Sequence, residues 1–134
     1  MLRFANSFAR QYQAQLFPLT VLPSYSMSIV GSFFPKNYEK KALDAAKQEL
    51  KQALHQSGMH KIKGYVVIGK TYDEILKAAD KLKCDLILLR ARNHELSEYL
   101  IGANAERVAS HSRQSVLIIR GELEGAANSD NPAV

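Results

Sequence analysis

Residues 85–120 read DLILLRARNHELSEYLIGANAERVASHSRQSVLIIR, and this stretch decides the expected fold. After Asp85 comes a short, wholly apolar run that ends at Leu89, which is typical of a strand buried on both faces. A second apolar run over 116–119 predicts the last strand. Between them lie a polar loop over 90–97 and a predicted helix over 104–111. The side of that helix that we expect to face inward holds Ala105, Val108 and Ala109.

The chain before residue 85 shows the same alternation of strands and helices. Apolar runs predict strands over 16–22 and 61–68, and helical spacing predicts helices over 2–15, 37–57 and 71–82. Pro18 cannot donate to a sheet ladder and therefore favours an edge or a bulge. Asn37 and Gly58 are the expected start and stop signals of the long second helix. Thr71 and Glu74 predict a capping box for the third.

This order predicts a doubly wound α/β fold, because strands that alternate with helices form a parallel sheet with helices on both faces. We expect one domain over residues 1–120 and a disordered tail over 121–134, where apolar periodicity is lacking. In such folds ligands bind at the carboxyl ends of the strands. The loop after Leu89 is therefore part of the predicted ligand edge.

The composition of the 134 residues narrows the class of protein. Hydrophobic residues make up 46% and charged residues 23%, which is typical of a globular domain. The single cysteine, Cys84, excludes an intramolecular disulfide and fits a reducing compartment. The net charge is +5, but no arginine-rich stripe with interleaved aromatics is present, which disfavours nucleic-acid binding. The N-terminus lacks the apolar core of an export signal, and three prolines interrupt the apolar stretch over 16–35. We expect a soluble cytoplasmic protein that does not enter a membrane.

The motifs over 85–120 resemble the C-terminal signature of the universal stress protein family. The matching pieces are the apolar strand 86–89, the Leu-Ile-Gly step 100–102, the helix 105–108 and the strand 116–120. Residues 102–105 and 19–23 are most similar to the F/G-type bacterial subgroup. Gly69, with the Asp73, Ile75 and Ala78 that follow it, matches the exit of the family's third strand. The resemblance covers nearly the whole chain up to Arg120 and implies a stress-response protein with a nucleotide-binding fold.

The resemblance also implies an ATP or AMP site, with phosphates held on backbone amides at a helix N-terminus. The residues that it places around the nucleotide are Val21, Leu89, Arg90, Arg92, Asn93, Gly102, Ala103, Asn104 and Ala105. Arg90 and Asn93 stand where the family has glycines, and Ala103 replaces a serine. The long side chain of Arg90 would either block the expected nucleotide cleft or pair with a phosphate. Weakened nucleotide binding and a relic turn that binds nothing both stay open.

One strand of the family has no counterpart in this sequence. Family members begin with a central strand that ends in an Asp near the adenine. Its place would be between the strands 16–22 and 85–89, whose flanks would then lack hydrogen-bond partners. Three explanations for the missing strand stay open: the sheet rearranges, a partner fills the gap, or the sequence is a shortened version of a longer protein. We expect the chain alone to be marginally stable or to aggregate, unless the two strands pair directly.

For the assembly, the resemblance implies a homodimer through the last strand. The residues of that expected interface are Val116, Leu117, Ile118 and Ile119. No catalytic residue and no metal site are expected, so the predicted function is a non-enzymatic stress-response protein; protein partners are not indicated. Two alternatives stay open: a small nucleotide hydrolase of the same fold class, for which Glu95 is the only carboxylate in the loop, with Glu98 nearby, and a defective fragment without independent function.

Other motifs have simpler interpretations. Residues 64–71, GYVVIGKT, match the P-loop pattern, but the variable positions are the predicted strand itself, so no phosphate-binding loop is expected. Cys84 has no paired base and is expected to be a structural thiol. Metal-ligand spacing is lacking among the histidines, which are His55, His60, His94 and His111. His94 is the one that lies in the ligand-facing loop.

Overall fold

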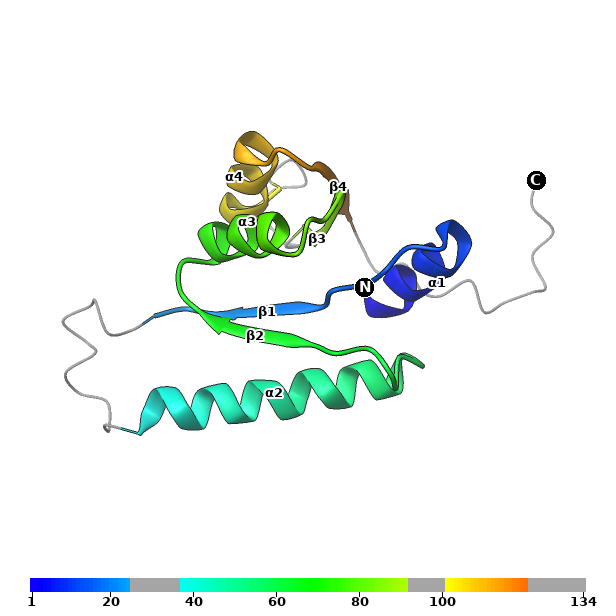
Figure 1. Ribbon diagram of the computed structural model, residues 1–134. Coiled ribbons are helices and arrows are strands. Elements are labelled where there is room, and N and C mark those ends of the chain that lie inside the picture. Colours follow the sequence, from blue (N-terminus) through cyan, green and yellow to red (C-terminus); the bar gives the residue numbers. More distant parts are fainter. Residues whose placement is uncertain (25–36, 92–100, 121–134) are drawn as a thin grey trace.

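The computed structural model describes residues 1–24, 37–91 and 101–120 (Figure 1). In chain order the elements are α1 (Leu2–Tyr12), β1 (Leu19–Leu22), α2 (Tyr38–Gln56), β2 (Tyr65–Ile68), α3 (Thr71–Lys81), β3 (Leu86–Arg90), α4 (Ala103–His111) and β4 (Ser115–Ile119). This confirms the predicted alternation. The expectations for the tail over 121–134 lie outside the described residues, and so do those for Arg92, Asn93, His94, Glu95 and Glu98.

The first helix and the first two strands are shorter than the sequence predicted. Helix α1 ends at Tyr12 because Gln13 adopts a left-handed conformation with φ of 53°. Strand β1 begins only after Pro18, although the Pro18 carbonyl still accepts a hydrogen bond of 2.8 Å from the Tyr65 N–H. Strand β2 begins at Tyr65 because residues 59–62 form a turn, closed by a hydrogen bond from the Ile62 N–H to the Met59 carbonyl.

Gly58 as the helix stop and Asn37 as the residue before α2 are confirmed, whereas the capping box predicted for α3 is wrong. Gly58 has a φ of 75°, the left-handed conformation that glycine adopts without strain after a helix. Asn37 precedes α2 without a side-chain cap bond. Thr71 is the first residue of α3 and not its cap, which is Lys70. The Glu74 side chain lies over Gly69 but makes no cap hydrogen bond, and its carboxylate binds Lys77 Nζ at 2.8 Å.

The described strands form two parallel sheets of two strands each. Strand β1 pairs with β2 in a register that runs from Leu19 opposite Tyr65 to Leu22 opposite Ile68. Strand β3 pairs with β4 from Leu86 opposite Ser115 to Arg90 opposite Ile119. The α/β class with parallel strands is thus confirmed, with a break between β1 and β3.

The helices show where that break lies. Helix α2 packs on one side of the β1–β2 sheet (Figure 1). Helix α3 contacts β1 from the other side of that sheet, and α3 also packs against α4. Crossovers between parallel strands are right-handed, so β3 must lie beyond β1 on the side away from β2. The strand order is therefore β2, β1, a gap, β3 and β4. The helices change faces at the gap, which makes it the topological switch point where ligands bind in such folds.

The main hydrophobic core belongs to the second sheet. It consists of Ala79 on α3, Ile87 on β3 and Val108 on α4, and Val108 has no exposed surface. Partly buried side chains that pack against it are Tyr72, Ile75, Leu76, Cys84, Leu89 and Val116. The helical spacing in the sequence predicts an inward stripe of α3 made of Tyr72, Ile75, Leu76, Ala79 and Leu82, and the first four of these lie at the core. Ala109 is exposed, contrary to expectation, because α4 buries only the narrow face that carries Ala105 and Val108.

Candidate functional site

The backbone of β1 turns one set of polar groups toward the gap. In a strand the N–H and C=O of one residue point to the same side, and successive residues alternate. The Pro18 carbonyl accepts a hydrogen bond from Tyr65, and the Leu22 carbonyl accepts one of 2.9 Å from Gly69. Pro18, Thr20 and Leu22 therefore face β2. The backbone groups of Leu19 and Val21 face the gap.

Strand β3 presents the matching edge from the other sheet. The Asp85 carbonyl accepts a hydrogen bond of 3.2 Å from the Ser115 N–H, and the Ala91 N–H donates one of 2.9 Å to the Ile119 carbonyl. The odd-numbered residues therefore face β4, and the backbone groups of Leu86 and Leu88 face the gap. Within the described ranges no backbone hydrogen bond joins β1 to β3.

The N-terminus of α4 has the geometry of an anion site. Gly102 precedes the helix with a φ of 96°, a conformation that favours glycine, and no side chain caps this end. The Glu106 N–H donates the first helical hydrogen bond, of 3.0 Å, to the Gly102 carbonyl. The N–H groups of Ala103, Asn104 and Ala105 precede it and have no partner within the helix. Such groups, together with the helix dipole, bind phosphate or carboxylate.

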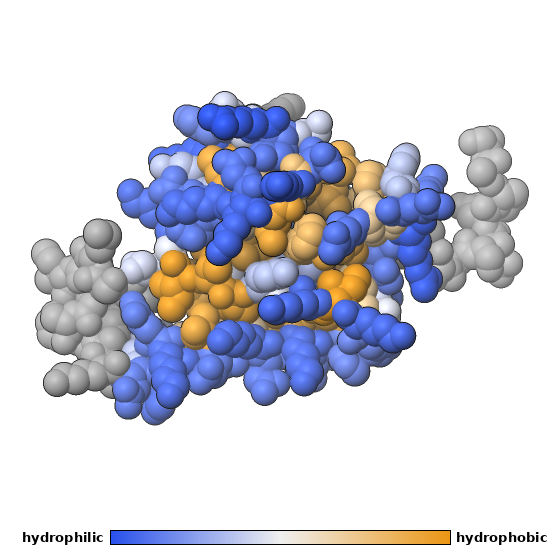
Figure 2. Space-filling model, viewed as in Figure 1, coloured by the Kyte–Doolittle hydropathy of each residue, from blue (hydrophilic) through white to orange (hydrophobic). Residues whose placement is uncertain are grey.

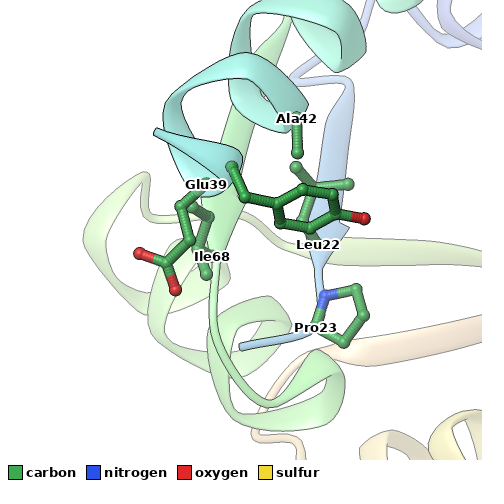
Figure 3. A pocket seen from close by; sticks show the side chains of 6 residues that line it. Leu22, Pro23, Glu39, Ala42 and Ile68 are labelled. Carbon is green, nitrogen blue, oxygen red and sulfur yellow. The ribbon is translucent and has the colours of Figure 1, made fainter. Parts of the chain in front are cut away.

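A small apolar pocket lies at the carboxyl ends of β1 and β2, with a volume of about 120 Å³. Its walls are Leu22, Pro23, Tyr38, Glu39, Ala42 and Ile68. Figure 3 shows the Glu39 carboxylate pointing away from Leu22 and Pro23, so the interior is hydrocarbon. The pocket is smaller than typical small-molecule sites and could hold only one edge of a flat ring. Sequence reasoning missed it, although Leu22 and Ile68 each end a strand on the predicted ligand edge.

The predicted site residues are divided between the two flanks of the gap. Val21 is half-buried in β1, whereas Leu89 packs into the core of the second sheet. Arg90 ends β3 and its side chain is exposed, so it does not fill the interior. Gly102 is half-buried, Ala103 and Asn104 are exposed, and Ala105 is buried. The site can thus use the amides of the α4 N-terminus, but not the side chain of Ala105.

The expected dimer strand offers only part of its surface. Leu117 is 36% exposed, whereas Ile119 is only 7% exposed and cannot form a surface contact. Val116 and Ile118 are half-buried on the side of the core. By the alternation of the ladder, the backbone groups of Val116 and Ile118 face away from β3, toward the outer edge of β4.

Several chemical features of the sequence can now be placed. Tyr65–Ile68 is strand β2, which confirms that the P-loop pattern is not a phosphate loop. Burial raises the pKa of the Cys84 thiol, and the neighbouring Asp85 carboxylate raises it further. His55 and His60 are neighbours, with their Nδ1 atoms 3.0 Å apart, which the sequence did not predict.

Within residues 1–24, 37–91 and 101–120, no group of three metal-ligating side chains comes together. None of the described helices has the length and hydropathy needed to cross a membrane.

Comparisons with known proteins agree with this architecture. Universal stress protein G of Shigella flexneri is 35% identical to the chain over 60 residues, and that of Salmonella typhimurium is 30% identical over the same length. Each match covers 45% of this chain and 42% of the relative, so the matched stretch spans less than half of these relatives.

Solved structures share the fold over most of the chain. UspA from Lactobacillus plantarum has a TM-score of 0.67 and 21% identity, covering 88% of this chain and 87% of that one. A universal stress protein in complex with cAMP has a TM-score of 0.59 and 25% identity, covering 89% and 84%. The model of the universal stress protein family matches residues 1–120. On the strength of that match, the chain belongs to the universal stress protein family.

Proposed function

We propose that this chain is a non-enzymatic stress-response protein whose binding of ATP or AMP is weakened. The observation that carries the proposal is the N-terminus of α4, where Gly102 keeps its left-handed φ of 96° and the amides of Ala103–Ala105 are left to an anion. The solved relative that binds cAMP supports an adenine nucleotide as the ligand class.

Three features of the site argue for low affinity. Ala103 has no hydroxyl to donate to a phosphate, and Glu106 places a carboxylate in the same first helical turn. The gap between β1 and β3 also leaves the adenine without the contact that a central strand would provide. A charge-assisted hydrogen bond is worth about 1.5–3 kcal/mol, and about 1.4 kcal/mol is tenfold in affinity. Losing one such contact therefore weakens binding by roughly tenfold or more.

Calorimetric titration of the full chain with ATP, AMP and cAMP tests the proposal. We expect dissociation constants above about 100 μM, equivalent to a binding free energy weaker than about 5.5 kcal/mol. Gly102→Ala should abolish the residual binding, because a Cβ is strained at this φ. Gly58→Ala is the matched control, since Gly58 also has a positive φ, of 75°, but lies at the end of α2. A low-micromolar constant for the unmodified chain would contradict weakened binding.

The rival function is a small nucleotide hydrolase. It needs an acid, a base or a metal ligand at the strand ends. Of the residues in the pocket beside β1 and β2, Glu39 is the carboxylate. We expect no phosphate release from ATP and Mg²⁺ above the buffer blank. Turnover that Glu39→Gln removes would favour the hydrolase over the binding protein.

For the assembly we propose a homodimer through the outer edge of β4. The backbone groups of Val116 and Ile118 face outward there, and Leu117 adds an exposed apolar side chain. A bare apolar edge strand is an aggregation hazard unless another chain pairs with it. Sedimentation at micromolar concentration should therefore show a dimer. A monodisperse monomer would count against this arrangement.

A further inference from the structure

A second, larger hollow lies at the opposite end of the first sheet. It has a volume of about 290 Å³ and lies between the second half of α2 and the segment that leads into β2. Its floor is apolar and consists of Leu50, Leu54, Met59, Ile62 and Val66. Since Gly64 lies just before β2, the hollow is at the amino end of that strand, away from the ligand edge described above.

The polar side chains around this hollow are all basic. They are Lys47, Lys51, His55, His60 and Lys63, and the lining contains no Asp or Glu. We refer to the hollow as the lysine–histidine groove. The salt bridge found in the described part of the chain joins Lys77 to Glu74 on α3, so within that part no acidic side chain forms an ion pair with the groove lysines. The Lys63 ammonium lies over the ring of Tyr65, at 5.5 Å from its centroid.

The two histidines are held together at the rim. Their rings meet edge to face with centroids 4.3 Å apart, and one Nδ1 donates to the other over 3.0 Å. The turn at Gly58 brings them together, because it reverses the chain at the end of α2. Each ring keeps its Nε2 atom for another partner. The pair therefore adds nitrogen ligands to a rim that is already positive.

The backbone of β2 contributes one further group. Tyr65 and Gly69 donate their N–H groups to β1, so by alternation the N–H and C=O of Val66 point to the outer edge of β2. Val66 lines the groove. An anion seated there would meet a backbone N–H as well as ammonium groups.

We propose that the lysine–histidine groove binds an amphipathic organic anion, with one carboxylate on a short apolar chain. The basic rim lacks counter-charges and attracts an anion, and the hydrocarbon floor gains from covering by an apolar chain. The volume, about 290 Å³, is near the lower limit of small-molecule sites, which favours a small ligand over a folded partner. This site is independent of the nucleotide proposal.

Octanoate is the probe, titrated into the full chain and followed by the amide shifts of residues 47–66 in NMR spectra. Octanol has the chain without the charge, acetate has the charge without the chain, and octylamine has the opposite charge. We expect octanoate to bind at least about tenfold more tightly than octanol or acetate, and octylamine not to bind. An acidic pentapeptide that binds more tightly than octanoate would overturn the assignment, because it would show a surface that recognises charge alone.

The double variant Lys51→Gln/Lys63→Gln should weaken octanoate binding at least tenfold. The matched control is Lys40→Gln/Lys41→Gln, which removes the same charge from exposed positions in the first turn of the same helix, outside the groove. All these side chains are exposed, so both variants should keep the circular dichroism spectrum of the parent. Equal loss in both variants, or equal affinity for octanoate and octanol, would refute the proposal.

Discussion

The β1–β2 sheet and the β3–β4 sheet are built alike but are packed differently. Every residue of β1 and β2 is only half-buried, although α2 covers one face of that sheet and α3 contacts the other. In the second sheet Ile87 and Ile119 are buried, and Val108 on α4 closes the core completely. Figure 2 shows hydrophobic side chains at the surface between the layer of α2 and that of α3 and α4. Each sheet has one edge at the gap and one outer edge, so the edges do not explain the difference; it comes from the side chains of α3, α4 and β3 that close around Val108.

The largest expected effect comes from filling the gap. A strand of the form Lys-x-Ile-Leu-Val-Pro-x-Asp, added ahead of Met1, should pair with the gap-facing groups of Leu19, Val21, Leu86 and Leu88. We expect the melting temperature, followed by circular dichroism, to rise by about 10 °C or more, which corresponds to a few kcal/mol. ATP binding should strengthen as well.

The control for this experiment carries proline at two central positions of the added segment, since proline cannot donate to a ladder. It should leave the melting temperature unchanged. An unmodified chain that already unfolds cooperatively at high temperature, and that the added strand does not stabilise, would show that β1 and β3 do not need a strand between them.

A matched pair of substitutions measures the difference between the two halves directly. Val108→Ala removes two methyl groups from a side chain with no exposed surface and should cost about 2–3 kcal/mol. Val67→Ala removes the same groups from half-buried β2 and should cost roughly half as much. Urea unfolding of the two variants gives both values. Equal costs would mean that the two sheets are equally well packed.

The dimer should respond to a charge on the outward side chain of β4. Leu117→Lys is expected to weaken the dimer about tenfold or more, which is about 1.4 kcal/mol, because it puts an ammonium group on each side of the symmetric contact. The change is seen as a shift of the monomer–dimer midpoint in sedimentation. Ser115→Lys serves as control, being exposed at the start of the strand. Ile119→Lys is unsuitable, since Ile119 is buried and its loss would unfold the chain.

Ala103→Ser should restore one hydroxyl donor at the α4 N-terminus. A single hydrogen bond contributes about 0.5–1.5 kcal/mol, so we expect ATP affinity to rise about threefold to tenfold. The gain is measured by the same titration as for the parent chain. Ala109→Ser is the control, because it adds a hydroxyl at an exposed position in the second turn of α4, away from the helix N-terminus. If both variants gained ATP affinity equally, the gain would not come from a hydroxyl at the phosphate site.

The smallest effect concerns Cys84, beside the core of the second sheet. Because burial raises the pKa of this thiol, less thiolate is present at a given pH. Iodoacetamide should therefore modify Cys84 more slowly than glutathione at pH 8. Asp85→Asn removes the second cause of the raised pKa, so it should speed the reaction modestly. Reaction as fast as that of glutathione would indicate that the packing around α3 and β3 is open.

Much of the fold could be predicted because strand and helix patterns are local. Val66, Leu88 and Ile118 lie in strands as expected, since uninterrupted apolar runs of this length suit a covered strand. For the candidate site, Gly102 precedes α4 with a φ of 96°, whereas binding of a nucleotide there stays a prediction. The apolar pocket at Leu22 and Ile68 was not predicted, because it depends on how α2 packs over the strand ends.

The sequence by itself determined the order of elements, the inward stripe of α3 and the left-handed stop at Gly58, because each depends on residues within a few positions of one another. The tertiary structure alone decided three other features. Glu74 binds Lys77 instead of capping α3, His55 meets His60, and the strands separate into two sheets. These features depend on which of several available partners comes within reach, and that choice is made only when distant segments pack together.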